Sequence, residues 1–520
     1  MQNNGAMPSS SRRSRAARLP WVLVCVLLTL AVAVAGVLAV PAIAGELAPA
    51  AQWRRTHAEL GAGAPPESSS SGSEAHDAAA GEAGSGTSSA SAGAEDAGPR
   101  AASSSEEAAA PAPLDPAEVE RALHAGLAGA PGTAAATVKE AGQDTALAGR
   151  SPGKPMVPAS NQKVLTALSV AEHVAPQERL ATTVVAGEEP GELTLVAGGD
   201  TLLAPGAGDP GAVNGHAGLG TLAQRTAETM RQETPGGVSG PVSVTVDTSL
   251  FAGPDRNPAW EDEDVASGEI TRVSPIALYS HRVPARDGTD PGAAGERPED
   301  PAVAALDEFA RQLQAELGDA ARVTARGRAR APAEAREVAR VESAPVHEQS
   351  AYMLAHSDNS LAETLARVAA GRSGREAGVA GVQNMLPATL REHGIDATGL
   401  HVLDASGMAP GNRVTPTTLA GALDTLLTEP RFAPYARGLP VAGGTGTLSE
   451  RFDDPQEAAA RGVSRAKTGT LLDVVALTGY VQREDGRVLV YSVVLNGVTG
   501  STDEAKDHVD RTVAELARTG

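Results

Sequence analysis

A serine and a lysine three residues apart, Ser160 and Lys163, are the first candidates for chemistry in this sequence. The run that follows them is helical in character, and positions i and i+3 lie on one face of a helix. The spacing therefore predicts that the Lys163 ammonium lies beside the Ser160 hydroxyl. A buried lysine near a second cation can lose its charge and take the serine proton. Taken alone, the pattern is more typical of a capping serine beside a surface lysine. It recurs at Ser151 and Lys154, where the intervening Pro-Gly indicates a turn.

A second group, Ser357-Asp358-Asn359, comes directly before another helix-like run. A serine and an asparagine two residues apart can both face a cleft from a turn. Ser357 would then relay a proton, and Asn359 would hold a substrate amide. The simpler interpretation is a helix cap, because Ser or Asp before Leu-Ala-Glu is ordinary capping chemistry.

A third group, Lys467-Thr468-Gly469-Thr470, precedes two strand-like runs. Lys467 and Thr468 would bind a substrate carboxylate through a positive charge and a hydroxyl. Gly469 would leave room for a substrate to approach the backbone, and the Thr470 N–H would donate to an oxyanion. By itself this group also fits the start of any strand. The three groups occur in order along the chain, however, and the second and third occur once each.

Together the three groups resemble the S-x-x-K, S-D-N and K-T-G signature of penicillin-recognising serine enzymes. About 200 residues separate Ser160 from Ser357, which is too long for a loop and predicts one or more inserted domains. Such an insert is typical of the low-molecular-mass class C penicillin-binding proteins, the D-alanyl-D-alanine carboxypeptidase/endopeptidase family. The chain resembles this family over roughly residues 116–520. Further stretches similar to the family's are Val196–Asp200, Val246–Phe251 with Trp260, Asp404–Gly407, Asn412–Pro416, Gly443–Leu448 and Arg465–Thr470.

The resemblance implies a mechanism of acyl transfer to peptidoglycan stem peptides. Lys163 would take the proton of Ser160, which would attack the carbonyl of the penultimate D-alanine, and Ser357 would protonate the leaving nitrogen. Backbone N–H groups of Ser160 and Thr470 would stabilise the oxyanion. The implied substrate-binding residues are Asn359, Lys467, Thr468, Gly469 and Thr470. Beta-lactams would acylate Ser160 as inhibitors, and neither a metal nor an organic cofactor is expected.

One position departs from the family pattern, and two other functions stay open. Pro410 stands where the family often carries an arginine, and Ala405 replaces a glycine, so recognition of a charged group on the stem peptide is open. A beta-lactamase would use the same three groups but would release the acyl group quickly; the long insert argues against it. A non-catalytic cell-wall binding protein is the other alternative, although all three groups are intact.

The start of the chain predicts export. Residues 1–20 contain several arginines and no acid, and residues 21–44 are almost wholly apolar. Such a run can cross a bilayer as a single helix, with the positive side in the cytoplasm and the rest of the chain outside. A cleaved signal peptide is the alternative, because Ala42-Ile43-Ala44 has the form of a cleavage site. The Ala-, Ser-, Gly- and Glu-rich residues 45–115 are predicted to be a disordered linker.

The remaining elements predict an α+β fold. A beta-lactamase/transpeptidase-like domain, an antiparallel sheet flanked by helices, would combine residues 116–182 and 345–520. Residues 183–344 would form a mainly β insert. The elements behind this prediction are a helix from Pro116, a strand-like run over 134–148, a helix over 302–317, a hairpin around Glu484-Asp485-Gly486 and a closing helix over 503–518.

The composition excludes several classes of protein. The 520 residues are 41% hydrophobic but only 2% aromatic, so a core built from Ala, Val and Leu is expected. A net charge of −21 argues against a nucleic-acid partner, because phosphates would be repelled. The single cysteine, Cys25, excludes an intramolecular disulfide and a cysteine-ligated zinc site. No His pair at i, i+4 encloses a Glu, so a zinc protease is not expected.

Overall fold

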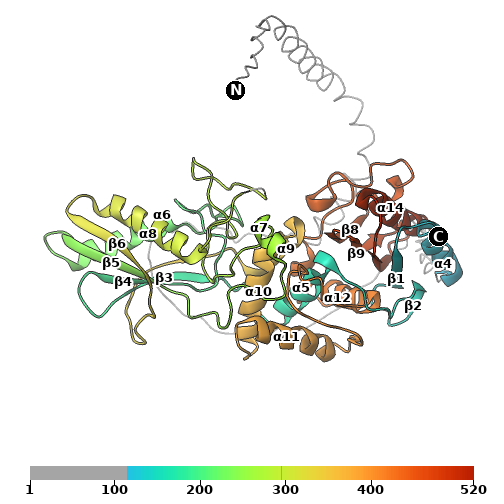
Figure 1. Ribbon diagram of the computed structural model, residues 1–520, viewed down its shortest axis with the longest axis horizontal. Coiled ribbons are helices and arrows are strands. Elements are labelled where there is room, and N and C mark those ends of the chain that lie inside the picture. Colours follow the sequence, from blue (N-terminus) through green and yellow to red (C-terminus); the bar gives the residue numbers. More distant parts are fainter. Residues whose placement is uncertain (1–113, 294, 520) are drawn as a thin grey trace, which may run out of the picture. The chain divides into compact units, whose positions relative to one another are not determined.

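The computed structural model describes residues 114–519 apart from residue 294 (Figure 1). The predicted basic tail (1–20) and apolar segment (21–44) lie outside the described residues, as does nearly all of the predicted linker. Within residues 114–519, no helix combines the length and the apolar character needed to cross a membrane.

The first sheet has five antiparallel strands in the order β2-β1-β10-β9-β8. They are β1 (Thr133–Glu140), β2 (Ala146–Arg150), β8 (Ser464–Leu471), β9 (Val474–Gln482) and β10 (Val488–Asn496). The predicted hairpin is present, because Gln482 of β9 pairs with Val488 of β10. β1 pairs along its whole length with β10, so strands from the two ends of the described chain lie next to each other.

Helices cover both faces of this sheet, which confirms the transpeptidase-like α+β architecture (Figure 1). Alternate residues of β10 face opposite sides: Val490 belongs to one buried cluster, and Leu489 and Tyr491 belong to the other. One face packs against α4 (Pro116–Gly126) and α14 (Thr502–Arg518). The helices on the other side are α5 (Gln162–His173) and α12 (Pro416–Thr428), with α9 (Val346–His356), α10 (Asn359–Arg372), α11 (Val379–Glu392) and α13 (Ala433–Ala436) packed around them.

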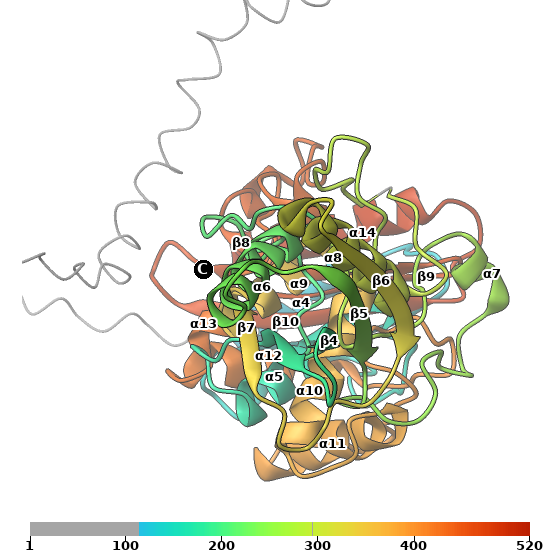
Figure 2. The same cartoon turned by 90° about the vertical axis from the view of Figure 1, so that its left-hand side faces the viewer.

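The insert is a mixed α/β unit, which corrects the prediction of a mainly β insert. Its sheet has the order β6-β5-β4-β3-β7, and β4, β5 and β6 run parallel. Parallel neighbours need crossover connections, and α6 (Leu219–Glu233) and α8 (Pro301–Leu317) supply them. The two helices pack side by side on one face of the sheet (Figure 2). The strands are β3 (Ala181–Ala186), β4 (Glu192–Val196), β5 (Gly240–Asp247), β6 (Ala321–Arg328) and β7 (Glu337–Glu342).

Short elements complete the fold around the cleft described below. Within the insert, α7 (Asp262–Ala266) lies on the long connection from β5 to α8. Three 3-10 turns, η1 (Ala159–Asn161), η2 (Gly446–Leu448) and η3 (Ala458–Ala460), belong to the transpeptidase-like domain. The turn η1 is the most important of these for function, because it carries Ser160 and leads directly into α5.

Candidate active site

Ser160 lies on a constrained turn that packs tightly against β8. Ala159, just before it, has a φ of 47°, a left-handed value that is unusual for a residue with a side chain. A Cβ added to Gly469 of β8 would lie 2.7 Å from Asn161 Nδ2 and 2.9 Å from Pro158 O. Gly469, which was predicted to leave room for a substrate, lines the cleft, but the space beside its Cα is filled by the Ser160 turn. Its lack of a side chain therefore brings β8 close to the nucleophile.

Lys163 is fully buried and bonded in a way that suits a base. Its Nζ lies 3.0 Å from Ser160 Oγ, 2.7 Å from Asn359 Oδ1 and 2.6 Å from Ser406 O. The last two atoms can only accept hydrogen bonds. A neutral Lys163 would thus donate its two N–H protons to Asn359 Oδ1 and Ser406 O. Its lone pair would then face the Ser160 hydroxyl.

Burial is the main influence on the pKa of Lys163. It lowers the pKa of Lys163 from 10.5 to about 8, even though the carboxylates of Asp404, Asp358 and Glu363 raise it. An amine with this pKa is partly neutral near pH 7 and can accept a proton from a serine hydroxyl at hydrogen-bond distance.

Ser357 of the second group and Lys467 of the third group are in direct contact in the site. Ser357 ends α9 in a left-handed conformation (φ 55°), and its Oγ accepts a hydrogen bond from Lys467 Nζ at 2.9 Å. Lys467 also donates to Thr468 O at 2.8 Å. Burial lowers the pKa of Lys467 well below its ordinary value, and the Lys163 ammonium lowers it further. A bound carboxylate would counteract both effects.

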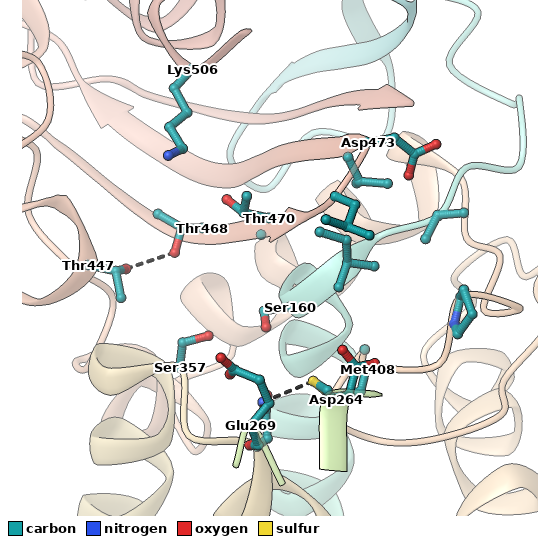
Figure 3. A pocket seen from close by; sticks show the side chains of 18 of the residues that line it. Ser160, Asp264, Glu269, Ser357, Met408, Thr447, Thr468, Thr470, Asp473 and Lys506 are labelled. Atoms are coloured by element: carbon teal, nitrogen blue, oxygen red, sulfur yellow. Dashed lines mark hydrogen bonds between the residues drawn. The ribbon is translucent and has the colours of Figure 1, made fainter. Parts of the chain in front are cut away.

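The predicted residues border one open cleft of about 1430 Å³. Figure 3 shows Ser160 between Ser357 and the strand that carries Thr468 and Thr470. The Oγ1 atoms of Thr468 and Thr447 lie 2.8 Å apart, a contact that none of the three groups predicts. Of the eight predicted site residues, the cleft is lined by Ser160, Ser357, Asn359, Thr468, Gly469 and Thr470, while Lys163 and Lys467 are bonded behind it.

Two buried carboxylates outside the eight predicted site residues hold the loop opposite Lys163. Asp404 accepts hydrogen bonds from Trp260 Nε1 at 2.9 Å and from backbone and side-chain donors of the same loop. Glu363 Oε1 accepts from the backbone N–H groups of Ala405 at 2.9 Å and Ser406 at 2.8 Å. These contacts aim the Ser406 carbonyl at Lys163. The sequence spacing could have identified Glu363, because it follows Asn359 by four residues and therefore lies on the same face of a helix.

The departure at Pro410 is accompanied by a nearby arginine. Pro410 and Arg413 both line the cleft, and Arg413 Nη1 donates to Pro410 O at 2.8 Å. A guanidinium group is therefore present at the cleft three residues after the position at which the sequence lacks one.

The chain is similar to known proteins in sequence and in fold. The profile of the D-Ala-D-Ala carboxypeptidase 3 (S13) family matches residues 120–299 and 287–519. Carboxypeptidase Rv3627c of Mycobacterium tuberculosis is 34% identical over 347 residues, 66% of this chain and 71% of the relative. Carboxypeptidase DacB of Mycolicibacterium smegmatis is 34% identical over 355 residues, 67% of this chain and 73% of the relative. The fold is similar to penicillin binding protein 4 of Haemophilus influenzae, with a TM-score of 0.58 and 18% identity over 76% of this chain and 98% of that structure.

Proposed function

The chain belongs to the D-Ala-D-Ala carboxypeptidase 3 (S13) family of serine peptidases, and from this premise we propose that it cleaves D-alanyl-D-alanine ends of peptidoglycan stem peptides through an acyl-enzyme on Ser160. One observation carries the proposal. Lys163 Nζ lies 3.0 Å from Ser160 Oγ, and its other two partners, Asn359 Oδ1 and Ser406 O, are pure acceptors. A hydroxyl next to such an amine is an activated nucleophile.

The contacts suggest how each side chain acts in turn. Neutral Lys163 takes the Ser160 proton as Oγ attacks the carbonyl of the penultimate D-alanine. Backbone N–H groups of Ser160 and Thr470 would stabilise the oxyanion. Ser357, whose Oγ accepts a hydrogen bond from Lys467, passes its hydroxyl proton to the leaving nitrogen and takes a proton from the Lys467 ammonium. Water then releases the acyl group from Ser160 Oγ.

The polar groups at β8 fit the terminal carboxylate of such a substrate. The Lys467 ammonium and the Thr468 hydroxyl lie on one strand, and Thr447 supports that hydroxyl. Asn359 Oδ1 is engaged by Lys163, whereas its Nδ2 lies 3.2 Å from Glu269 O and 3.1 Å from Met408 Sδ at the cleft wall. A shift of this amide toward a peptide carbonyl would bind the substrate backbone.

A fluorescent penicillin tests the nucleophile, because beta-lactams acylate the serine of penicillin-recognising enzymes. We expect covalent labelling of the wild-type protein and of Ser151→Ala, and none of Ser160→Ala. Ser151 is the matched control, since it belongs to the second S-x-x-K sequence, where Lys154 follows a turn. Labelling of Ser160→Ala at the wild-type level would overturn the proposal. A penicilloyl adduct that turns over within seconds would favour a beta-lactamase instead.

Defined muropeptides separate the two peptidase activities. Release of free D-alanine from a pentapeptide reports carboxypeptidase activity, and monomers released from cross-linked dimers report endopeptidase activity. Mass spectrometry identifies both products. The absence of both products from a chain that reacts with penicillin would contradict the proposed substrate.

We further propose that the peptidase acts outside the cytoplasm, tethered by residues 21–44. The support is the sequence itself: an apolar run preceded by arginines. Alkaline extraction of membranes should leave the full chain in the pellet. A secreted chain whose N-terminus lies just after Ala44 would show that the segment is a cleaved signal peptide.

A further inference from the structure

The aspartate between Ser357 and Asn359 is held by the insert. Asp358 is buried, and its Oδ2 accepts a hydrogen bond from Arg282 Nη1 at 3.0 Å. Its Oδ1 accepts from Ser280 Oγ at 2.8 Å. The side chains of Arg282 and Asp358 are only 9% and 1% exposed. The pair is therefore an almost dry ion pair between the insert and the turn that carries the second group.

Arg297, a second arginine of the connection from β5 to α8, also bonds to the start of α10. Arg297 Nη1 donates to Ser360 Oγ at 3.1 Å and to Ser280 O at 3.0 Å. Its Nη2 donates to Glu269 O at 3.1 Å, and the same carbonyl accepts from Asn359 Nδ2 at 3.2 Å. One guanidinium group thus links the start of α10, the wall of the cleft and the loop that holds Asp358.

The loop around Ser280 is strained, so its contacts must hold it in place. Tyr279, Ser280 and His281 are consecutive residues with left-handed φ values of 41°, 56° and 63°. Each of these conformations is unfavourable for a residue with a side chain and persists only where the surroundings enforce it. Arg297 bonds to carbonyls of this run, and His281 Nε2 accepts from the Ser274 N–H at 3.1 Å. Burial lowers the pKa of His281 to about 3, which keeps the ring neutral and able to accept.

We propose that Arg282 and Arg297 are positioning residues for the acyl-transfer reaction. They fix Asp358 and the start of α10, and through them the directions of Ser357 Oγ toward Lys467 and of Asn359 Oδ1 toward Lys163. This role rests on the proposed function of the cleft. It gives the insert a part in catalysis, through the connection that lines the cleft at Glu269 and carries both arginines.

The test uses the full chain with both arginines changed to methionine and Arg282 also changed to lysine. Arg282→Met and Arg297→Met remove the guanidinium group, and Arg282→Lys keeps a charge that can still reach Asp358. Acylation by a fluorescent penicillin is measured so that the rate constant for acylation is separated from the dissociation constant of the non-covalent complex. The control is Lys139→Met, which breaks the part-buried pair of Lys139 and Asp424 (2.6 Å) away from the cleft.

We expect both Met variants to lose about 100-fold in the acylation rate constant, because a misplacement of about 1 Å has that effect on a reaction between oriented groups. The dissociation constant should change much less, since Lys467 and Thr468 are untouched. The acylation rate constant of Arg282→Lys should be about tenfold higher than that of Arg282→Met. A lysine ammonium again neutralises Asp358 but lacks the planar set of N–H donors of a guanidinium. Lys139→Met should lower the melting temperature yet acylate at the wild-type rate constant.

Acylation of Arg282→Met and Arg297→Met at the wild-type rate constant would overturn the proposal. If single variants fail to fold because Asp358 is left unpaired, the double variant Arg282→Met/Asp358→Asn carries the test, since it removes both charges together. It should also acylate slowly, and a wild-type rate constant would again refute the role. Labelling of the wild-type chain reports the proposed function, whereas the variant-to-wild-type ratio reports positioning, so the two failures are distinguishable.

Discussion

The pH dependence of acylation should reveal Lys163 as the base. Its pKa of about 8 means that roughly one Lys163 in ten is neutral at pH 7. At the ordinary value of 10.5 only about one in three thousand would be, so burial supplies about a 300-fold larger population of base. The acylation rate constant should therefore rise between pH 7 and 9, with a midpoint near 8.

Changing Glu363→Gln perturbs this midpoint in a defined direction. The Glu363 carboxylate raises the pKa of Lys163, so its removal should move the midpoint to lower pH. Burial raises the pKa of Glu363 itself to about 7, which leaves it mostly charged where Lys163 titrates. Glutamine keeps an oxygen that can accept from Ala405 and Ser406, so the loop that faces Lys163 should remain in place.

Stopped-flow fluorescence of penicillin acylation from pH 5 to 10 provides the measurement. Asp424→Asn is the control, because Asp424 is a part-buried carboxylate that pairs with Lys139 away from the cleft. Its midpoint should match the wild type. A wild-type rate constant that rises only above about pH 10, or a Glu363→Gln midpoint that does not fall, would refute this assignment of the base.

Three further substitutions test residues that line the cleft or support the loop beside it. Gly469→Ala should slow acylation by at least about tenfold, because its Cβ would push β8 away from the turn that carries the nucleophile. Trp260→Phe should lower the free energy of unfolding by about 2 kcal/mol, measured by urea denaturation, because Asp404 loses a charged hydrogen bond. Thr447→Val should raise KM for D-alanine release several-fold with a smaller change in kcat, because the Thr468 hydroxyl loses the partner that orients it.

Local patterns predicted several elements around the three groups. The Asp-Gly turn between apolar runs gave the β9–β10 hairpin, and the helical spacing after Ser160 gave α5. These features depend on residues that are close in sequence. The prediction that Lys163 lies beside Ser160 is of the same kind, because one helical turn sets the distance.

The features that the sequence left unassigned depend on contacts between distant segments. The parallel pairing of β4, β5 and β6 joins strands separated by whole helices, so it depends on contacts that neighbouring residues do not reveal. Arg282 and Arg297 are ordinary arginines in a loop-like stretch, and only the fold brings them to Asp358 and Ser360. A charged residue in a connection of this kind gives no local signal of burial.

The order of the first sheet explains why the three groups converge although they are far apart in sequence. β1 precedes Ser160 in the chain and pairs with β10. β9 lies next to β10 in the sheet, and β8, which carries Lys467, lies next to β9. The turn η1 packs against β8 and β9, so the same sheet brings Ser160 next to the strand that carries Lys467. The helix α14 covers buried residues of these strands, including Leu489 and Tyr491. Deletion of α14 would expose that core and should abolish acylation, although every residue of the three groups would remain in the chain.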